Sequence, residues 1–269
     1  MSCKIQCKCL TSIPPAYAST PFEVPTGLLI DLDGTVLPEN NRPTNRVIDA
    51  IAEASGLIPV AVASGRVQDD VCHFARLFGL TVPQISDNGA TLIDPVTGRA
   101  LKRHIIDRET AEMVVSDLKK SSYRVLVCDA GRFVDNPDQI EDWKITIVMA
   151  KFDSEDEARG WIKGFPTDKV SSYATVDNLG HWYVDCTSLG VNKATGARNF
   201  AKEVGVDVSK LMVIGDGWND VPMFDVAGTR IAMEGAPQEM LKRATEVVPG
   251  IEHDGAVLAI EKYVLNLSS

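Results

Sequence analysis

Short apolar runs alternate with amphipathic stretches between residues 27 and 79. The apolar runs at 27–30 and 57–63 have the length of buried strands. Between them, Thr44 is placed to cap a helix that stops at Gly56, and a second helix is predicted over 67–78. Strands and helices that alternate in this way form parallel strands joined by right-handed crossovers.

Hairpin patterns replace this alternation in the middle of the chain. Strands predicted over 91–93 and 100–106 flank the turn sequence Asp94-Pro-Val-Thr-Gly98. More elements follow, with strands predicted over 124–128, 132–135, 144–149 and 181–186 and helices over 108–120 and 155–163. Hairpins combined with two helices predict an α+β unit over about residues 90–185. This unit is inserted into the part of the chain in which strands and helices alternate.

The alternation resumes towards the C-terminus. The pattern there predicts strands over 211–214, 230–233 and 246–248 and helices over 192–203, 221–227 and 237–244. The expected fold class is therefore α/β, with a Rossmann-like parallel-sheet core formed by residues 26–89 and 186–269 and the α+β unit inserted at 90–185. Residues 1–25 are predicted to be a flexible N-terminal extension.

Composition and charge narrow the class of function. The chain has 269 residues, of which 45% are hydrophobic and 24% charged, as in soluble globular domains. The net charge of −10 argues against nucleic acid as a partner. An acidic protein can still bind a phosphorylated small molecule through one cationic pocket and a metal ion. No run reaches the roughly 18 apolar residues of a membrane helix, so no membrane partner is expected.

The cysteines fall into two groups. Three cluster near the N-terminus, where a metal site or a redox pair is one interpretation. Zinc-type sites usually have a second group of ligands and none follows, so a loose leader is preferred for Cys3, Cys7 and Cys9. The others each stand alone among apolar neighbours, as buried thiols of a reducing compartment do: Cys72, Cys128 and Cys186. The expected location is therefore cytoplasmic.

Four short segments combine polar residues with strand ends or helix starts, the edge at which parallel sheets bind ligands. The first, Asp31-Leu-Asp33-Gly-Thr35, follows the strand at 27–30 and directs two carboxylates to this edge. Ordinary turns are also rich in Asp and Gly, so a simple turn is the alternative interpretation. The second, Ala63-Ser64-Gly65-Arg66, offers a hydroxyl and a glycine amide at the start of a helix. That arrangement suits either a phosphate site or a plain N-cap.

The other two segments lie in the C-terminal part of the chain. Lys193 falls in the first turn of a predicted helix, where a cation is disfavoured unless an anion lies nearby; the alternative is an exposed, solvated lysine. The segment Gly215-Asp216-Gly217-Trp218-Asn219-Asp220 follows an apolar strand. Its Asp216, Asn219 and Asp220 offer hard oxygen ligands to a magnesium ion shared with Asp31. Carboxylates could not cluster there at low cost without such a cation.

In this order and at these positions, the four segments resemble the motifs of the haloacid dehalogenase superfamily. They are most similar to those of its Cof-type hydrolases of subclass IIB, which carry an α+β cap between the second and third motifs. The resemblance covers residues 26–263. Ser86-Asp-Asn-Gly-Ala90 looks like the segment that leads into the family's cap. The usual C-terminal tail is matched by Ala227-Gly, Ile231-Ala-Met and Asp254-Gly-Ala.

The resemblance implies a role for each motif residue. Asp31 would attack phosphorus and form an aspartyl-phosphate, and Asp33 would act as general acid and then as general base. The implied Mg²⁺ ligands are Asp31, the main-chain carbonyl of Asp33, and Asp216, with Asn219 or Asp220 completing or supporting the set. The phosphoryl oxygens would be bound by Ser64, Gly65, Lys193 and Asn219.

The implied function is Mg²⁺-dependent hydrolysis of a small phosphorylated metabolite of the phosphoglycolate or sugar phosphate class. A phosphomutase of the phosphomannomutase type, which shares the Asp-x-Asp start and the cap type, is the nearest alternative. A non-catalytic phosphometabolite-binding protein is the other. The protein is expected to be a monomer or a small homo-oligomer. Four residues of the inserted unit are either substrate contacts or core: Trp143, Lys144, His181 and Tyr183.

Overall fold

The computed structural model describes residues 24–121, 123–166 and 168–266. Except for Val24 and Pro25, the predicted extension over 1–25 lies outside the described residues, as does the cluster of Cys3, Cys7 and Cys9. Over the described ranges, no helix is both long enough and apolar enough to cross a membrane. The prediction of buried single thiols is confirmed for Cys72, Cys128 and Cys186.

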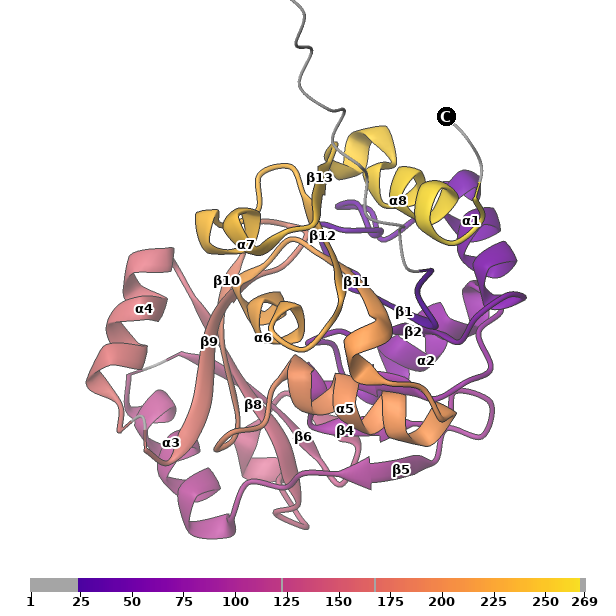
Figure 1. Cartoon of the computed structure of the whole chain (residues 1–269). Helices are drawn as coiled ribbons and strands as arrows, with labels where there is room; N and C mark the ends of the chain where they lie inside the picture. Colours follow the sequence, from indigo (N-terminus) through magenta and orange to yellow (C-terminus); the bar gives the residue numbers. More distant parts are fainter. Residues whose placement is uncertain (1–23, 122, 167, 267–269) are drawn as a thin grey trace, which may run out of the picture.

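A parallel five-stranded sheet forms the centre of the larger unit (Figure 1). Its strand order is β13-β12-β11-β1-β2, and every neighbouring pair is parallel. This confirms the parallel sheet expected from the alternating pattern. The strands are β1 (Gly27–Ile30), β2 (Val60–Val62), β11 (Leu211–Gly215), β12 (Thr229–Met233) and β13 (Glu246–Val248).

Helices cover both faces of this sheet because successive strand residues point to opposite sides. In β1, Leu28 and Ile30 belong to one hydrophobic cluster and Leu29 to the other. The first cluster packs under α1 (Asn45–Ser55), α2 (Gln68–Leu77) and α8 (Gly255–Tyr263). The second packs under α5 (Lys193–Val204), α6 (Val221–Phe224) and α7 (Gln238–Arg243).

A second, antiparallel sheet forms the smaller unit, in the order β7-β6-β8-β10-β9. Helices α3 (Arg108–Lys120) and α4 (Glu155–Gly164) cover one of its faces through a separate hydrophobic cluster that runs from Ile106 to Cys186. We refer to residues 106–188 as the cap. Its strands are β6 (Arg124–Asp129), β7 (Arg132–Val134), β8 (Ile145–Phe152), β9 (Val170–Val176) and β10 (Trp182–Ser188).

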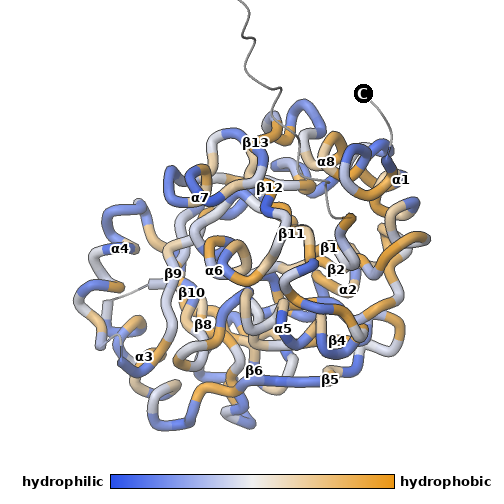
Figure 2. The backbone as a smooth tube through the Cα atoms, in the orientation of Figure 1, coloured by the Kyte–Doolittle hydropathy of each residue, from blue (hydrophilic) through white to orange (hydrophobic). Residues whose placement is uncertain are grey.

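The predicted hairpin after residue 90 connects the parallel-sheet unit to the cap along the chain. Strands β3 (Gln84–Ser86), β4 (Thr91–Ile93) and β5 (Ala100–Arg103) form a small antiparallel sheet. Leu92 and Ile93 pack into the two clusters of the parallel sheet and not into the cap cluster. Strand β5 is partly exposed and hydrophilic, whereas the buried strands are hydrophobic (Figure 2). The division into 26–89, 90–185 and 186–269 stays a prediction.

Among the described strands and α-helices, three have no counterpart among the predicted ones. Strand β3 has polar residues, Gln84 and Ser86, on both sides of a single apolar one, so it forms no apolar run. Strand β9 carries serines and a threonine among its apolar residues. Helix α8 is largely buried, and its exposed side carries Leu258 as well as Lys262, so its amphipathic pattern is weak.

Candidate active site

Three carboxylates meet where the central strands end. Asp31 follows β1, and its main-chain N–H donates to the carbonyl of Ile214 in the adjacent β11 at 3.0 Å. Asp216 follows β11, and Asp220 closes the next turn of 3-10 helix, Trp218–Asp220. One oxygen from each of Asp31, Asp216 and Asp220 lies within 4.8 Å of the other two. The parallel pairing of β1 and β11 brings the first and fourth motifs together at this edge.

Lys193 is fully buried between two of these carboxylates. Its Nζ donates to Oδ1 of Asp31 and to Oδ1 of Asp220, each at 2.5 Å. The side chain leaves the first turn of α5, which is fixed by a capping box between Asn192 and Thr195. Burial lowers the pKa of Lys193, but the charges of Asp220 and Asp31 outweigh that effect and raise it. The alternative of an exposed, solvated lysine is therefore wrong.

The cluster holds more negative than positive charge. Burial, and then the charge of Asp220, raise the pKa of Asp31 well above its usual value. The same two causes raise the pKa of Asp216 to about 7. Both oxygens of Asp220 have donors from the protein, because Oδ2 accepts from the N–H groups of Asp216 and Gly217 at 3.0 and 2.9 Å. The donor set of hard oxygens and its excess negative charge fit a divalent cation.

Gly34 and Thr35 place Asp216 in this cluster. The hydroxyl of Thr35 donates to Oδ1 of Asp216 at 3.0 Å. Gly34 has a positive φ of 76°, and a Cβ at this position would overlap the carboxylate of Asp216. The Asp31–Thr35 segment therefore does more than turn the chain, because its fourth position leaves room for the carboxylate of Asp216 and its fifth position binds it.

The second motif lies in the turn before α2. Val67, not Ser64, is the N-cap of α2, so the alternative of a plain N-cap is wrong, and so is the expectation that Ser64 and Gly65 open the helix. Ser64 is buried, and its Oγ accepts from the N–H of Arg66 at 3.1 Å. Gly65 faces the same cavity as Asn219, whose Nδ2 donates to Oδ1 of Asn88 at 3.3 Å.

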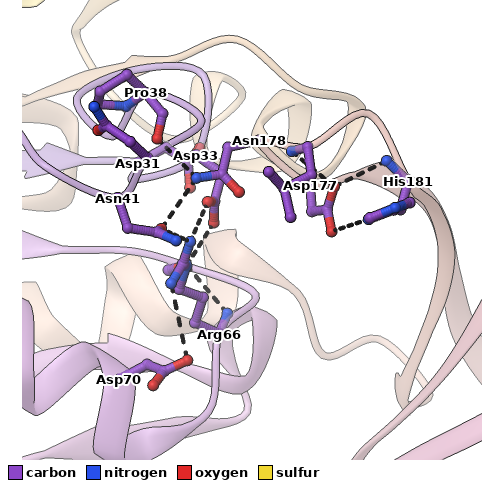
Figure 3. Close-up of polar contacts among 12 residues, drawn as sticks. Asp31, Asp33, Pro38, Asn41, Arg66, Asp70, Asp177, Asn178 and His181 are labelled. Atoms are coloured by element: carbon purple, nitrogen blue, oxygen red, sulfur yellow. Dashed lines mark hydrogen bonds and ion pairs between the residues drawn. The ribbon is translucent and has the colours of Figure 1, made fainter.

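Asp33 lies outside the carboxylate cluster and pairs with Arg66 (Figure 3). The guanidinium forms two hydrogen bonds to the carboxylate, from Nε to Oδ2 at 2.9 Å and from Nη2 to Oδ1 at 2.6 Å. Nη2 also donates to Oδ1 of Asn41 at 2.5 Å, and Nη1 lies 3.9 Å from Oδ2 of Asp70. This pairing of Arg66 could not be expected from the sequence, although Arg66 directly follows the Ser64-Gly65 pair.

The cap reaches this pair through the turn between β9 and β10 (Figure 3). Nδ2 of Asn178 donates to the carbonyl of Pro38 at 2.8 Å and to Oδ1 of Asn41 at 3.0 Å. Asp177 fixes the turn, because it accepts from Nδ1 of His181 at 3.0 Å and from two main-chain N–H groups. A chain of hydrogen bonds therefore runs from the cap turn through Asn41 and Arg66 to Asp33.

A cavity of about 660 Å³ separates the sheet edge from the open face of the cap sheet. The parallel-sheet unit contributes motif residues to its lining: Asp31, Asp33, Gly65, Asp216 and Asn219. Of the four cap residues singled out from the sequence, Tyr183 lines the cavity, whereas Trp143 packs against the cap cluster. Lys144 and His181 do not belong to the lining.

Asp185 is a cavity residue that the sequence analysis did not single out. Only 4% of it is exposed, and its Oδ2 accepts from the hydroxyl of Thr175 at 3.1 Å. Burial raises the pKa of Asp185 to about 7. The sequence offers one signal for such a residue, which is a single acid within the mostly buried strand Trp182–Ser188.

Comparisons with known proteins agree with this geometry. The sequence model of the haloacid dehalogenase-like hydrolases matches residues 28–161 and 134–260. A phosphoglycolate phosphatase of Archaeoglobus fulgidus is 27% identical over 237 residues, covering 88% of this chain and 96% of that protein. The 5-amino-6-(5-phospho-D-ribitylamino)uracil phosphatase of Escherichia coli K12 is 25% identical, with 87% and 94% covered.

Solved structures share the fold at lower identity. A haloacid dehalogenase-like hydrolase from B. subtilis superposes with a TM-score of 0.76 at 18% identity, over 88% of this chain and 99% of the other. A sugar phosphatase of subclass IIB superposes with a TM-score of 0.73 at 19% identity, over 88% and 98%. The resemblance inferred from the four motifs is confirmed, and the chain belongs to the haloacid dehalogenase-like hydrolase family.

Proposed function

We propose that this hydrolase is a Mg²⁺-dependent phosphatase that acts on a small phosphorylated metabolite through an aspartyl-phosphate on Asp31. The observation that carries the proposal is the position of Asp31, which lines the cavity floor, accepts a hydrogen bond from Lys193 and lies beside Asp216. A carboxylate so placed can attack a phosphate that enters from the cavity.

The residues at the strand ends suit a magnesium ion. Asp31 and Asp216 would hold it, together with the main-chain carbonyl of Asp33, while Asp220 supports the set through its bonds to Lys193 and to the loop. When bound, Mg²⁺ would neutralise part of the repulsion between an anionic nucleophile and a phosphate. The excess of carboxylates over lysine in the cluster supports this assignment.

The first half-reaction transfers the phosphoryl group to Asp31. A carboxylate oxygen of Asp31 forms a bond to phosphorus while the bond from phosphorus to the leaving oxygen breaks. Lys193, Ser64, the N–H of Gly65 and Asn219 are the groups proposed to bind the phosphoryl oxygens, and of these Gly65 and Asn219 line the cavity. Their donors would stabilise the charge that spreads over these oxygens in the transition state.

Asp33 is the group proposed to move the proton. It would donate a proton to the leaving oxygen, and it would then accept one from the water that attacks the aspartyl-phosphate. Asp33 lines the cavity, and two hydrogen bonds from Arg66 hold its carboxylate in place.

Phosphate release tests the proposal. Inorganic phosphate is measured with p-nitrophenyl phosphate and a panel of phosphorylated metabolites, with and without Mg²⁺, for the wild type and for Asp31→Asn. Release should require Mg²⁺ and should fall at least about 1,000-fold in Asp31→Asn. Asp49→Asn, at an exposed position of α1, is the matched control and should behave as the wild type. Full activity in a folded Asp31→Asn protein would refute the proposal, as would isomerisation of a sugar phosphate without phosphate release.

A further inference from the structure

The cap supplies the part of the cavity that faces away from the phosphate. Across the cap sheet, Met149 of β8 lies opposite Leu126 of β6 on one side and Asp185 of β10 on the other. Their sequence neighbours, including Val125, Val148 and Val184, pack beneath α3 and α4. Because strand side chains alternate, the row formed by Leu126, Met149 and Asp185 points to the open face and into the cavity.

The ionisable residues that the cap contributes to the cavity lining are acidic. The cap contributes apolar and aromatic residues such as Leu126, Met149 and Trp182, and its ionisable acids are Glu155, Asp177 and Asp185. Within the described part of the chain, no lysine, arginine or histidine of the cap lines the cavity. The only positive charge is therefore on the side of the parallel sheet.

The basic residues nearby are already paired or stand outside the lining. Arg66 binds Asp33 and Asn41, and Lys193 binds Asp31 and Asp220. On the cap sheet, Lys151 and Arg124 occupy the next row outwards, beside Tyr183, and Arg124 is exposed and lies 4.0 Å from Asp135. An anionic group within the cavity would therefore meet the carboxylate of Asp185, whereas Arg66 and Lys193 already bind carboxylates.

Asp185 is placed to contact the leaving group directly. Its Oδ2 lies so close to the phosphate-binding turn that a Cβ on Gly65 would be 3.3 Å from it. Thr175 satisfies Oδ2, and no described residue donates a hydrogen bond to Oδ1. A carboxylate oxygen that lacks a protein donor, in a side chain with so little exposure to solvent, gains most from a donor on the ligand, such as a hydroxyl or an ammonium group.

We infer that the substrate's leaving group carries no negative charge and donates a hydrogen bond to Asp185 from a hydroxyl or ammonium group. This inference rests on the proposed phosphatase function and adds the chemical class of the substrate. Esters with a carboxylate, such as phosphoglycolate, and bisphosphates are then poor substrates, because an anion would be desolvated beside Asp185 without a counter-ion. The apolar remainder of the cap face would pack against carbon atoms of the leaving group.

A series of phosphate esters of equal size and different charge tests the inference. The three substrates are 2-phosphoglycolate, 2-hydroxyethyl phosphate and phosphoethanolamine, whose two-carbon leaving groups are anionic, neutral and cationic. We expect kcat/KM to be at least about tenfold higher for the neutral and cationic esters than for phosphoglycolate. In Asp185→Asn this ratio should shrink towards one, whereas Asp156→Asn, an exposed cap position outside the lining, should keep the wild-type ratio.

The outcomes separate this inference from the proposed function. If phosphoglycolate is hydrolysed as well as the neutral ester by the wild type, the inference is wrong while the phosphatase proposal stands. The wild-type comparison needs no variant to fold. If folded Asp185→Asn keeps the wild-type ratio, Asp185 does not set the preference and the inference fails. If none of the esters, including p-nitrophenyl phosphate, releases phosphate, the proposed function itself is refuted.

Discussion

The edge of the parallel sheet and the face of the cap sheet enclose the same cavity but are built differently. At the sheet edge, Lys193, Asp31, Asp216 and Asp220 are joined to one another or to main-chain donors by short hydrogen bonds. On the cap face, Asp185 has one hydrogen-bond partner and its neighbours are apolar. The sheet edge is a fixed electrostatic network. The cap face instead offers a mostly apolar surface on which the ionisable groups are acidic.

The difference matches the two tasks of a phosphatase. Phosphoryl transfer depends on charges that are already in place when the substrate arrives, because reorganising them would add to the barrier. Recognition of a leaving group depends on exclusion as well as attraction, and an unpaired carboxylate excludes anions. The two regions meet at Asn178, where the cap turn contacts Asn41 and, through Arg66, Asp33.

The largest effect is expected at the sheet edge. Lys193→Met removes the cation that two buried carboxylates share, so we expect phosphate release to fall at least about 1,000-fold. The free energy of unfolding should fall by about 3–5 kcal/mol at neutral pH, because Asp31 and Asp220 lose their partner. Activity and urea unfolding measure both effects. Lys202→Met, at an exposed position of the same helix, is the control. Wild-type activity in Lys193→Met would show that phosphate release does not depend on this network.

A smaller effect is expected where the two regions meet. Asn178→Ala removes the hydrogen bonds from the cap turn to Pro38 and Asn41, which should loosen the contact that helps to hold Arg66 on Asp33. Steady-state kinetics should show kcat/KM reduced about tenfold, with unfolding changed by less than about 1 kcal/mol, since the bonds are partly exposed. Asn136→Ala, in a cap turn outside the cavity lining, should leave kinetics unchanged. Equal kinetics in the two variants would show that the cap turn does not influence Asp33.

The smallest expected effect is a change with pH in the preference for a neutral over an anionic leaving group. Burial raises the pKa of Asp185 to about 7, with Thr175 and the charge of Lys193 opposing the rise. Asp185 is then neutral below this pH and charged above it. The kcat/KM ratio of 2-hydroxyethyl phosphate to 2-phosphoglycolate should therefore increase a few-fold from pH 6 to pH 8. The ionisation of the phosphate group is similar in both esters and largely cancels in the ratio.

The same shift in pKa has a consequence for stability. The folded protein holds the Asp185 proton up to about pH 7, whereas the unfolded chain releases it near pH 4, so this group's contribution to stability falls as pH rises between these values. Asp185→Asn should accordingly be the more stable protein at pH 8 and should show a pH-independent substrate ratio. A ratio that varies with pH equally in Asp185→Asn would exclude Asp185 as the cause.

Local signals predicted much of the core. Thr44 and Gly56 are the caps of α1, as expected, and α3 and β13 have the predicted bounds. Caps, breakers and apolar periodicity act over a few residues, so one stretch of sequence contains the whole signal. The motifs also lie at strand ends or, for Lys193, at a helix start, as the pattern indicated, although Ser64 and Gly65 do not open α2.

Long-range contacts decided what local signals could not. The first turn of α5 looked compatible with a solvated lysine, and only the packing of α5 against the sheet buried Lys193 between Asp31 and Asp220. The pairing of Arg66 with Asp33 joins residues that are 33 positions apart. Strand pairing likewise turned Asp185 towards the turn that contains Gly65.

Order along the chain was therefore enough to identify the family, the carboxylates proposed to react and the strands that carry them, because each motif is contiguous and lies at a strand end or a helix start. The tertiary structure alone decided which charges are paired and which line the cavity without a counter-ion. The physical reason is that pairing and burial depend on distances between segments far apart in sequence. Those distances exist only after the strands have paired and the cap has packed against the sheet.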